Sequence, residues 1–265
     1  MRTGLSRLAP ALRVFLGGLG LAAALGTFQL PSSAPALADD SVTTVTSPDT
    51  VTAPDNADLQ PAGPRTAFPL RRDDFGPYVD VIHKRLLWLG YPISQSETGA
   101  MAFGRTTLAA LHAFQEKFSL RKTNTVTIGV WDDLKKVAGA VGTLPPACAG
   151  VDTICISTLQ KVVRWVSDGR VILTADARFG IAGNETATGT FAVTRKSRDH
   201  VSSLYRTSMP FALFFKGGQA VHYSPYFKAD GYVGGSHGCV NLRDHAKAQW
   251  LFDHSRLGTR VHIGA

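Results

Sequence analysis

The chain has 265 residues, of which 44% are hydrophobic and 18% are charged. This length suits one large or two modest domains with tails, and the composition is that of a globular protein rather than a disordered one. The formal net charge is +8, but the basic residues are scattered and form no run of five or more, so nucleic-acid binding is not indicated.

Residues 1–38 have the pattern of a secretory signal. Three arginines are followed by an apolar run, and Ala36-Leu37-Ala38 provides a small-x-small cleavage site. The run is shorter than the roughly 20 residues that span a bilayer comfortably. We therefore expect export without stable membrane insertion after signal cleavage, with an uncleaved anchor as the alternative. Residues 39–66 are rich in Thr, Ser, Pro and Asp without periodicity, which predicts a flexible linker.

Residues 67–143 carry apolar residues at helical spacing and predict a small three-helix domain. The first helix is marked by Val79, Ile82, Leu86 and Leu89, and Gly90-Tyr91-Pro92 ends it. A second apolar face runs from Leu108 to Phe118, with Thr106 or Thr107 able to cap its start. A third, shorter helix is expected from Ile128 to Val137.

Residues 144–151 contain Pro145-Pro146 and predict a linker between two domains. From residue 152 to 265 the pattern changes to short strands with turn signals such as Asp168-Gly169, and Asp244 can cap one late helix. The predicted fold class is therefore α+β, with a small three-helix domain followed by a mainly-β sandwich.

The chain has three cysteines, so at least one of them cannot pair within the chain. In an oxidising compartment we expect Cys148 to pair with Cys155, which leaves Cys239 free. The alternative is that Cys148 and Cys155 are two unpaired thiols near the domain junction.

The most informative stretch is Gly235-Ser236-His237-Gly238-Cys239-Val240-Asn241-Leu242, with His222 upstream. A cysteine thiolate is a strong nucleophile, and it needs a nearby base or a positive environment to form. A glycine beside the cysteine lets a carbonyl group approach the backbone amides. Two different interpretations are a buried, unreactive cysteine and a metal site formed by His222, His237 and Cys239.

The segment Ser236 to Leu242 closely resembles the nucleophile motif of L,D-transpeptidases. The resemblance extends over about residues 152–263, and it implies a catalytic domain at 152–265 of that family's sandwich type. It implies that Cys239 is the nucleophile and His222 the base. It also implies that amides near His237, Gly238 and Cys239 stabilise an oxyanion, with His237 as a possible direct participant.

The resemblance also suggests residues that contact the substrate. Asn241 stands where many relatives have arginine, and Met209 and Phe211 belong to a segment similar to one near the acyl-donor site. Tyr223 replaces a glycine that often follows the base, and it would narrow the pocket. Ser236 is expected to hold the loop through bonds to the backbone.

Residues 67–143 resemble a peptidoglycan-binding domain of the three-helix type, on Leu86-x-x-Leu89-Gly90-Tyr91, Phe103-Gly104 and Leu111-x-x-Phe114-Gln115. The two resemblances together imply a wall enzyme in the periplasm or cell wall, with peptidoglycan stem peptides and glycan strands as partners. A spacer without affinity for glycan is the alternative for the helical domain. No cofactor or metal is expected.

The implied reaction is transfer of a tetrapeptide stem through a Cys239 thioester to form a 3→3 cross-link, and the family suggests acylation by carbapenems. With water as the acceptor, the same intermediate would give L,D-carboxypeptidase activity. Three further interpretations are a non-catalytic wall-binding protein, a cysteine peptidase of another family and a zinc peptidase.

Overall fold

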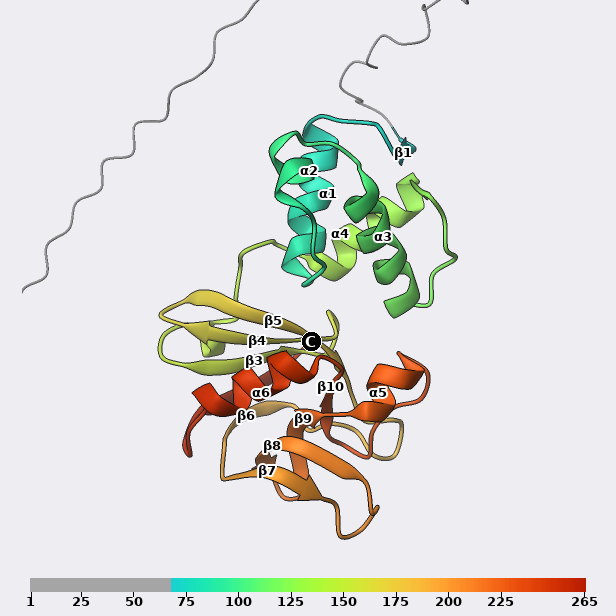
Figure 1. Ribbon diagram of the computed structural model, residues 1–265. Helices are drawn as coiled ribbons and strands as arrows, with labels where there is room; N and C mark the ends of the chain where they lie inside the picture. Colours follow the sequence, from blue (N-terminus) through green and yellow to red (C-terminus); the bar gives the residue numbers. More distant parts are fainter. Residues whose placement is uncertain (1–67) are drawn as a thin grey trace, which may run out of the picture. The chain divides into compact units, whose positions relative to one another are not determined.

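The computed structural model describes residues 68–265 (Figure 1). The predicted signal at 1–38 and the predicted linker at 39–66 lie outside the described residues. Among the residues that are described, no helix has the length and apolarity needed to cross a membrane.

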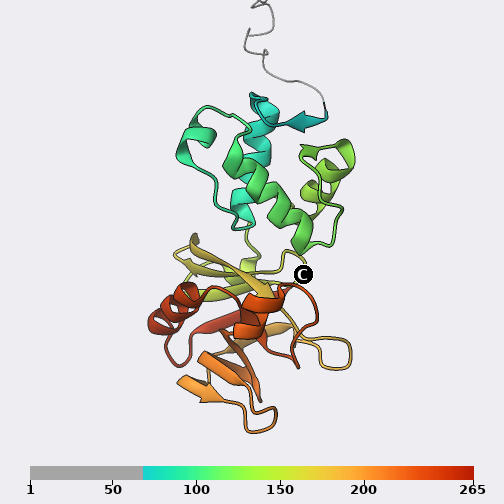
Figure 2. The same cartoon turned by 45° about the vertical axis from the view of Figure 1, so that its right-hand side comes forward.

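The helical part lies within residues 68–143. It contains β1 (Leu70–Arg71), α1 (Pro77–Trp88), α2 (Gln95–Gly99), α3 (Arg105–Lys117), β2 (Thr125–Val126) and α4 (Ile128–Ala138). The predicted helices correspond to α1, α3 and α4, which lie together in Figure 2, while α2 is a short helix that the sequence did not predict. The apolar residues predicted for the first helix share one buried core with Leu111 and Phe114 of α3.

Helix α3 begins without the predicted threonine cap. Its N-cap is Gly104, and the carboxylate of Glu97 on α2 accepts hydrogen bonds from the amides of Thr106 and Thr107, both at 2.8 Å. Burial alone would raise the pKa of Glu97, but the bonds from Thr107 and Thr106 lower it to about 2. Helix α3 is therefore capped by a carboxylate from a neighbouring helix, and a carboxylate is also favoured there by the helix dipole.

The C-terminal part is built on one sheet, which has nine strands within residues 152–265. In spatial order these are β6 (Gly189–Ala192), β11 (Arg260–Gly264), β3 (Thr153–Ser157), β4 (Val162–Ser167), β5 (Arg170–Arg178), β10 (Val240–Leu242), β9 (Gln219–Tyr223), β8 (Ser208–Lys216) and β7 (Arg195–Val201). Two helices, α5 (Pro225–Asp230) and α6 (His245–His254), complete it.

The sheet curls so that its two halves enclose a common core (Figure 1). Ile154 of β3, Leu213 of β8 and Leu251 of α6 belong to one buried cluster, although β3 and β8 are far apart in the strand order. The sequence predicted a sandwich, and the structure produces its two layers from one continuous hydrogen-bonded sheet. Curling lets each strand bury alternate side chains against the opposite half.

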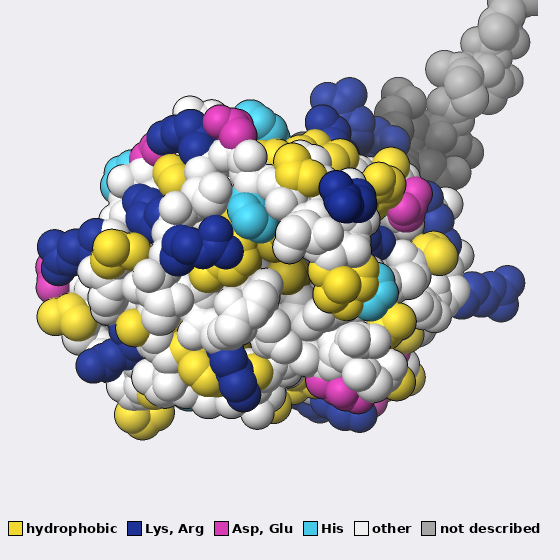
Figure 3. All heavy atoms as spheres, turned by 90° about the horizontal axis from the view of Figure 1, so that it is seen from below, with side chains coloured by type: hydrophobic (Ala, Val, Ile, Leu, Met, Phe, Trp, Pro, Cys, Tyr) yellow, Lys and Arg dark blue, Asp and Glu magenta, His cyan; other side chains and the backbone are white. Residues whose placement is uncertain are grey.

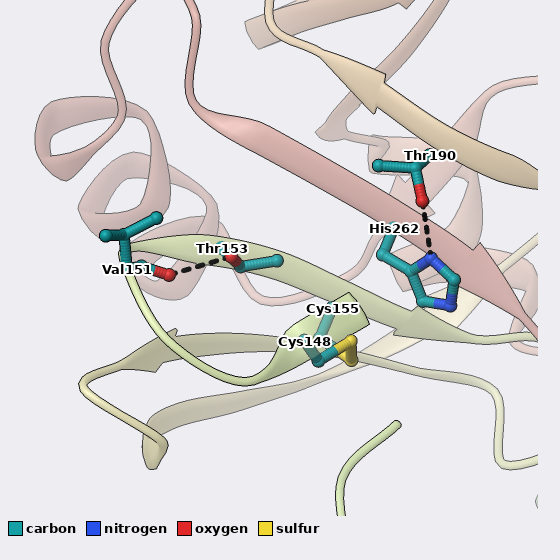
Figure 4. The surroundings of a disulfide bond; sticks show 6 residues. All are labelled: Cys148, Val151, Thr153, Cys155, Thr190 and His262. Carbon is teal, nitrogen blue, oxygen red and sulfur yellow. Dashed lines mark hydrogen bonds between the residues drawn. A yellow bond between two sulfur atoms is a disulfide. The ribbon is translucent and has the colours of Figure 1, made fainter. Parts of the chain in front are cut away.

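The predicted linker contains a short 3-10 helix, Pro146–Cys148, and a disulfide joins Cys148 to Cys155 of β3, with a Cα–Cα distance of 5.6 Å (Figure 4). The hydroxyl of Thr153 donates to the carbonyl of Val151 at 2.8 Å in the same turn. The disulfide therefore ties the chain between the two parts to the first strand of the sheet.

Figure 3 shows one face of the molecule with side chains coloured by type. Lys and Arg side chains are spread among hydrophobic and uncharged ones and do not merge into a continuous basic area on this face. This distribution agrees with the scattered basic residues of the sequence.

Candidate active site

Strands β9 and β10 bring the predicted base and nucleophile to the same surface of the sheet. They are parallel neighbours, and Asn241 lies directly beside His222. Val240, Leu242 and Val221 point into the core, so the alternation of a strand turns Asn241 and His222 to the opposite face. Cys239 lies just before β10 and packs on Ala220 and Phe214 on that same face.

This face of the sheet forms the floor of a cavity of about 640 Å³. Its lining includes Arg178, Met209, His222, Ser236, Cys239 and Asn241. Most of the predicted site residues are therefore brought together around one cavity.

The side chain of His222 is held in a defined orientation. Its Nδ1 lies 2.6 Å from the carbonyl oxygen of Tyr223. A carbonyl oxygen only accepts, so Nδ1 carries the proton and Nε2 is left as the basic nitrogen. Burial lowers the pKa of His222 to about 4, although the bonds to Tyr223 and Asn241 oppose this shift. The imidazole is therefore neutral at neutral pH and able to accept a proton.

Cys239 is the free cysteine of the described residues, and it is half-buried. Its Sγ lies 3.9 Å from the carbonyl oxygen of Gly218. Burial raises the pKa of the Cys239 thiol, and the amide of Ala220 offsets part of this shift. The resting pair is therefore a neutral thiol and a neutral imidazole, and attack requires transfer of the thiol proton.

Ser236 holds the loop that carries Cys239. Its hydroxyl donates to the carbonyl oxygen of Cys239 at 2.6 Å and accepts from the amide of Gly238 at 3.2 Å. The Gly238 amide, which the sequence suggested as an oxyanion donor, is thus engaged within the loop. Within the described residues, neither the His237 nor the Cys239 amide bonds to a side chain, so these two are the better candidates.

His237 is exposed and lies against a neighbouring turn. Its ring stacks on Tyr205, with centroids 4.2 Å apart and planes at 16°. Tyr205 lies between β7 and β8 and also lines the cavity. Nothing in the sequence indicates this contact, because the two residues are far apart in the chain.

Two residues predicted to contact substrate do not face the cavity. Tyr223 follows His222, so strand alternation turns it to the core, where its ring lies 5.0 Å from that of His245. Phe211 packs in the same core, also 5.0 Å from His245. Met209 does line the cavity. Residues two apart in a regular strand face the same side. Phe211 has a φ of 60°, which breaks this alternation, so Phe211 and Met209 face opposite sides of the sheet.

Gln219 was not predicted from the sequence, yet it supports the loop before Cys239. Its Oε1 accepts from the amide of Ala187 at 3.0 Å, and its Nε2 donates to the carbonyl of Glu185 at 3.1 Å. A Cβ on Gly238 would lie only 2.5 Å from Gln219 Nε2. Gln219 therefore packs between the 185–187 segment and the loop before Cys239.

A metal site formed by His222, His237 and Cys239 was one interpretation of the sequence. Among the described residues, no group of three or more His, Cys, Asp or Glu side chains is arranged to hold a metal ion.

A family model matches the C-terminal part of the chain. Residues 152–263 match the family model of YkuD, the L,D-transpeptidase catalytic domain. No curated protein matches the chain.

Several solved structures are similar to the chain. An L,D-transpeptidase from Stackebrandtia nassauensis has 21% identity, covers 78% of this chain and 97% of its own, and gives a TM-score of 0.50. One from Xylanimonas cellulosilytica has 28% identity over 77% of this chain and 100% of its own, with a TM-score of 0.47. One from Mycobacterium smegmatis has 25% identity over 43% and 58%, with a TM-score of 0.40.

The Stackebrandtia structure shows a shared fold, and the family model covers the segment that contains both His222 and Cys239. Residues 152–263 of this chain therefore match the L,D-transpeptidase catalytic domain.

Proposed function

We propose that the protein is an exported L,D-transpeptidase that forms 3→3 cross-links in peptidoglycan through a Cys239 thioester. The observation that carries this proposal is the arrangement of Cys239 and His222 on one cavity face, with His222 Nδ1 bonded to Tyr223. The match of residues 152–263 to the L,D-transpeptidase catalytic domain supports peptidoglycan as the substrate.

The first half of the reaction forms the thioester. Nε2 of His222 accepts the proton of the Cys239 thiol as Sγ attacks the carbonyl carbon of the third stem residue. The carbonyl oxygen becomes an oxyanion that the amides near Cys239 stabilise, an effect worth roughly 10²- to 10³-fold in rate in other acyl-transfer enzymes. The C–N bond then breaks, and His222 gives its proton to the departing D-alanine amine.

The second half returns the enzyme to its starting state. The side-chain amine of a second stem attacks the thioester carbonyl, His222 removes a proton from that amine, and the C–S bond breaks. The proton then returns to Sγ, so the product is one new amide bond and a free thiol. With water in place of the amine, the product is a tripeptide and the activity is that of an L,D-carboxypeptidase.

The helical part is proposed to bind glycan strands and to keep the catalytic domain near the wall. The resemblance to a peptidoglycan-binding domain supports this role. A spacer without affinity for glycan is the alternative, and sedimentation of residues 67–143 with purified peptidoglycan would separate the two.

Mass spectrometry of the reaction tests the catalytic proposal. The protein without residues 1–38, and the same protein with Cys239→Ala, are incubated with a disaccharide-tetrapeptide. A cross-linked dimer that lacks one D-alanine and depends on Cys239 is the expected product, and a carbapenem adduct should show the same dependence. Tripeptide alone would indicate the carboxypeptidase, and no product from folded protein would favour a non-catalytic wall-binding protein.

A further inference from the structure

A lysine of the helical part is completely buried. Lys117, at the end of α3, has a side-chain exposure of 0%, and its Nζ donates to Oδ1 of Asp176 on β5 at 2.7 Å. Burying an ammonium group costs several kcal/mol or more unless a partner offsets it. The ion pair therefore connects the helical part to the sheet through an ammonium group that is itself fully buried, while Asp176 is 17% exposed.

The Lys117–Asp176 pair belongs to a larger cluster. Asp176 also accepts from Arg243, and Lys161 Nζ donates to the backbone carbonyl of Lys117 at 3.0 Å. Aromatic rings surround Lys117 Nζ, with centroid distances of 5.4 Å for Tyr91, 5.9 Å for Phe118 and 5.8 Å for Tyr232. Asp176 thus pairs with two cations, Lys117 and Arg243, while Lys161 contacts the backbone of Lys117. The aromatic faces add to the stabilisation of the buried ammonium group.

Two members of this cluster flank the catalytic loop in the sequence. Tyr232 precedes Cys239, and Arg243 follows β10 directly. Arg243 donates to Asp176 and lies 5.3 Å from the Tyr232 ring, and the same ring lies 5.8 Å from Lys117 Nζ. Arg178 also holds the backbone around Tyr232, through the carbonyls of Gly231 (3.0 Å) and Val233 (2.8 Å). The segment between Tyr232 and Arg243, which contains Cys239, is therefore anchored at both ends.

We propose that Lys117 is a positioning residue for the reaction: through Asp176, Arg243 and Tyr232 it fixes both ends of the segment that carries Cys239. This role rests on the proposed function and extends it to a residue of the helical part. The helical part then supports the catalytic loop directly, in addition to any contact with the wall.

The test compares Lys117→Met with Lys135→Met in the full-length protein. Lys135 is a suitable control, because it is also a lysine of the helical part paired with an aspartate, Asp132 at 3.0 Å, but its side chain is 55% exposed. Lys117→Met should slow thioester formation at saturating stem peptide by about tenfold or more, a change that corresponds to roughly 1.4 kcal/mol. KM should stay close to the wild-type value, and Lys135→Met should match the wild type in both constants.

Removing both partners tests whether Lys117 and Asp176 act through the same contact, and the rates are compared only between folded variants. Asp176→Asn should slow thioester formation as Lys117→Met does, and the double variant should be no slower than the worse single one, since both act through one contact. A folded Lys117→Met protein with the wild-type rate would overturn the proposal. So would single variants whose effects simply add.

If Lys117→Met does not fold, Lys117→Arg keeps the charge and gives a second test. Burial lowers the pKa of Lys117 to about 8, with Asp176 opposing the shift. The wild-type rate of thioester formation should therefore fall above pH 8, as Lys117 loses its proton, whereas the arginine variant should keep its rate to about pH 9 because arginine does not titrate there. The charged and titratable groups that face Lys117 are Asp176, Arg243, Lys161, Tyr91 and Tyr232.

Among these groups, Lys161 also has a pKa lowered by burial, so Lys161→Arg is measured in parallel. A fall above pH 8 that persists in Lys117→Arg would contradict the inference, and one that vanishes only in Lys161→Arg would assign the effect to Lys161 instead.

Failure of the proposed function would look different. A wild-type protein that forms no thioester with any stem peptide rejects the transpeptidase, and the inference is then judged by alkylation of Cys239 with iodoacetamide. Lys117→Met should change that rate at fixed pH while Lys135→Met does not, and equal rates in all three proteins would overturn it.

Discussion

At the scale of single residues, burial sets the protonation of both groups that we propose to react. The pKa of His222 is lowered to about 4 and that of the Cys239 thiol is raised, each chiefly because burial disfavours the charged form. A pair tuned in this way stays neutral at rest, so proton transfer accompanies attack and no thiolate is held in advance.

This protonation predicts an unusual pH dependence. An ordinary imidazole with a pKa of 6.5 is mostly protonated at pH 5, whereas His222 stays neutral down to about pH 4. Thioester formation measured from pH 3.5 to 7 should therefore reach half its plateau near pH 4. His222→Gln should lose about 10²- to 10⁴-fold in rate, while His254→Gln, on the surface of α6, should keep the wild-type profile. A midpoint near pH 6.5 would contradict the buried, neutral base.

At the scale of elements, local patterns predicted several helices and singled out His222 and Cys239 as candidates, but they did not predict the parts that surround these two residues. The spacing of apolar residues predicted α1, α3 and α4. The motif around Cys239 pointed to the proposed nucleophile, which lies beside the cavity. Gln219 and Tyr205 were missed, because their roles depend on contacts between distant segments. Phe211 was expected to contact the substrate, but it packs in the core. Its positive φ changes the strand alternation, and residue types alone do not indicate this.

The loop before Cys239 depends on a glycine, and this leads to a second prediction. Gly238 has a φ of 104°, and an added Cβ would lie 2.5 Å from Gln219 Nε2. Gly238→Ala should lower the free energy of unfolding by roughly 1–3 kcal/mol, measured by urea titration, and should slow thioester formation. Gly218→Ala is the control for stability alone, because a Cβ there meets nothing within 4 Å. Equal stability of the two variants would show that the loop accommodates a side chain at 238.

At the scale of the whole molecule, an ion pair and a disulfide are among the features that connect the two parts. The Lys117–Asp176 pair links α3 to β5, and the disulfide Cys148–Cys155 fixes the chain between the parts to β3. The disulfide suits an oxidising compartment, which supports the proposed export. The cysteine spacing suggested this pairing, but the sequence could not reveal Lys117, which looks like an ordinary surface lysine at the end of an amphipathic helix.

The disulfide leads to the last prediction, which concerns the cysteines together. Protein recovered from the medium or periplasm and unfolded in guanidinium should show one reactive thiol per chain, that of Cys239, and three after reduction. Replacing Cys148 and Cys155 by alanine should lower the free energy of unfolding by about 2–3 kcal/mol, because the short loop is no longer closed in the unfolded chain. Cys239→Ala should leave that free energy nearly unchanged, since its thiol is half-buried at the cavity wall. Three thiols before reduction would show that the bond does not form in the exported protein, and export would then be supported by the signal-like residues 1–38 alone.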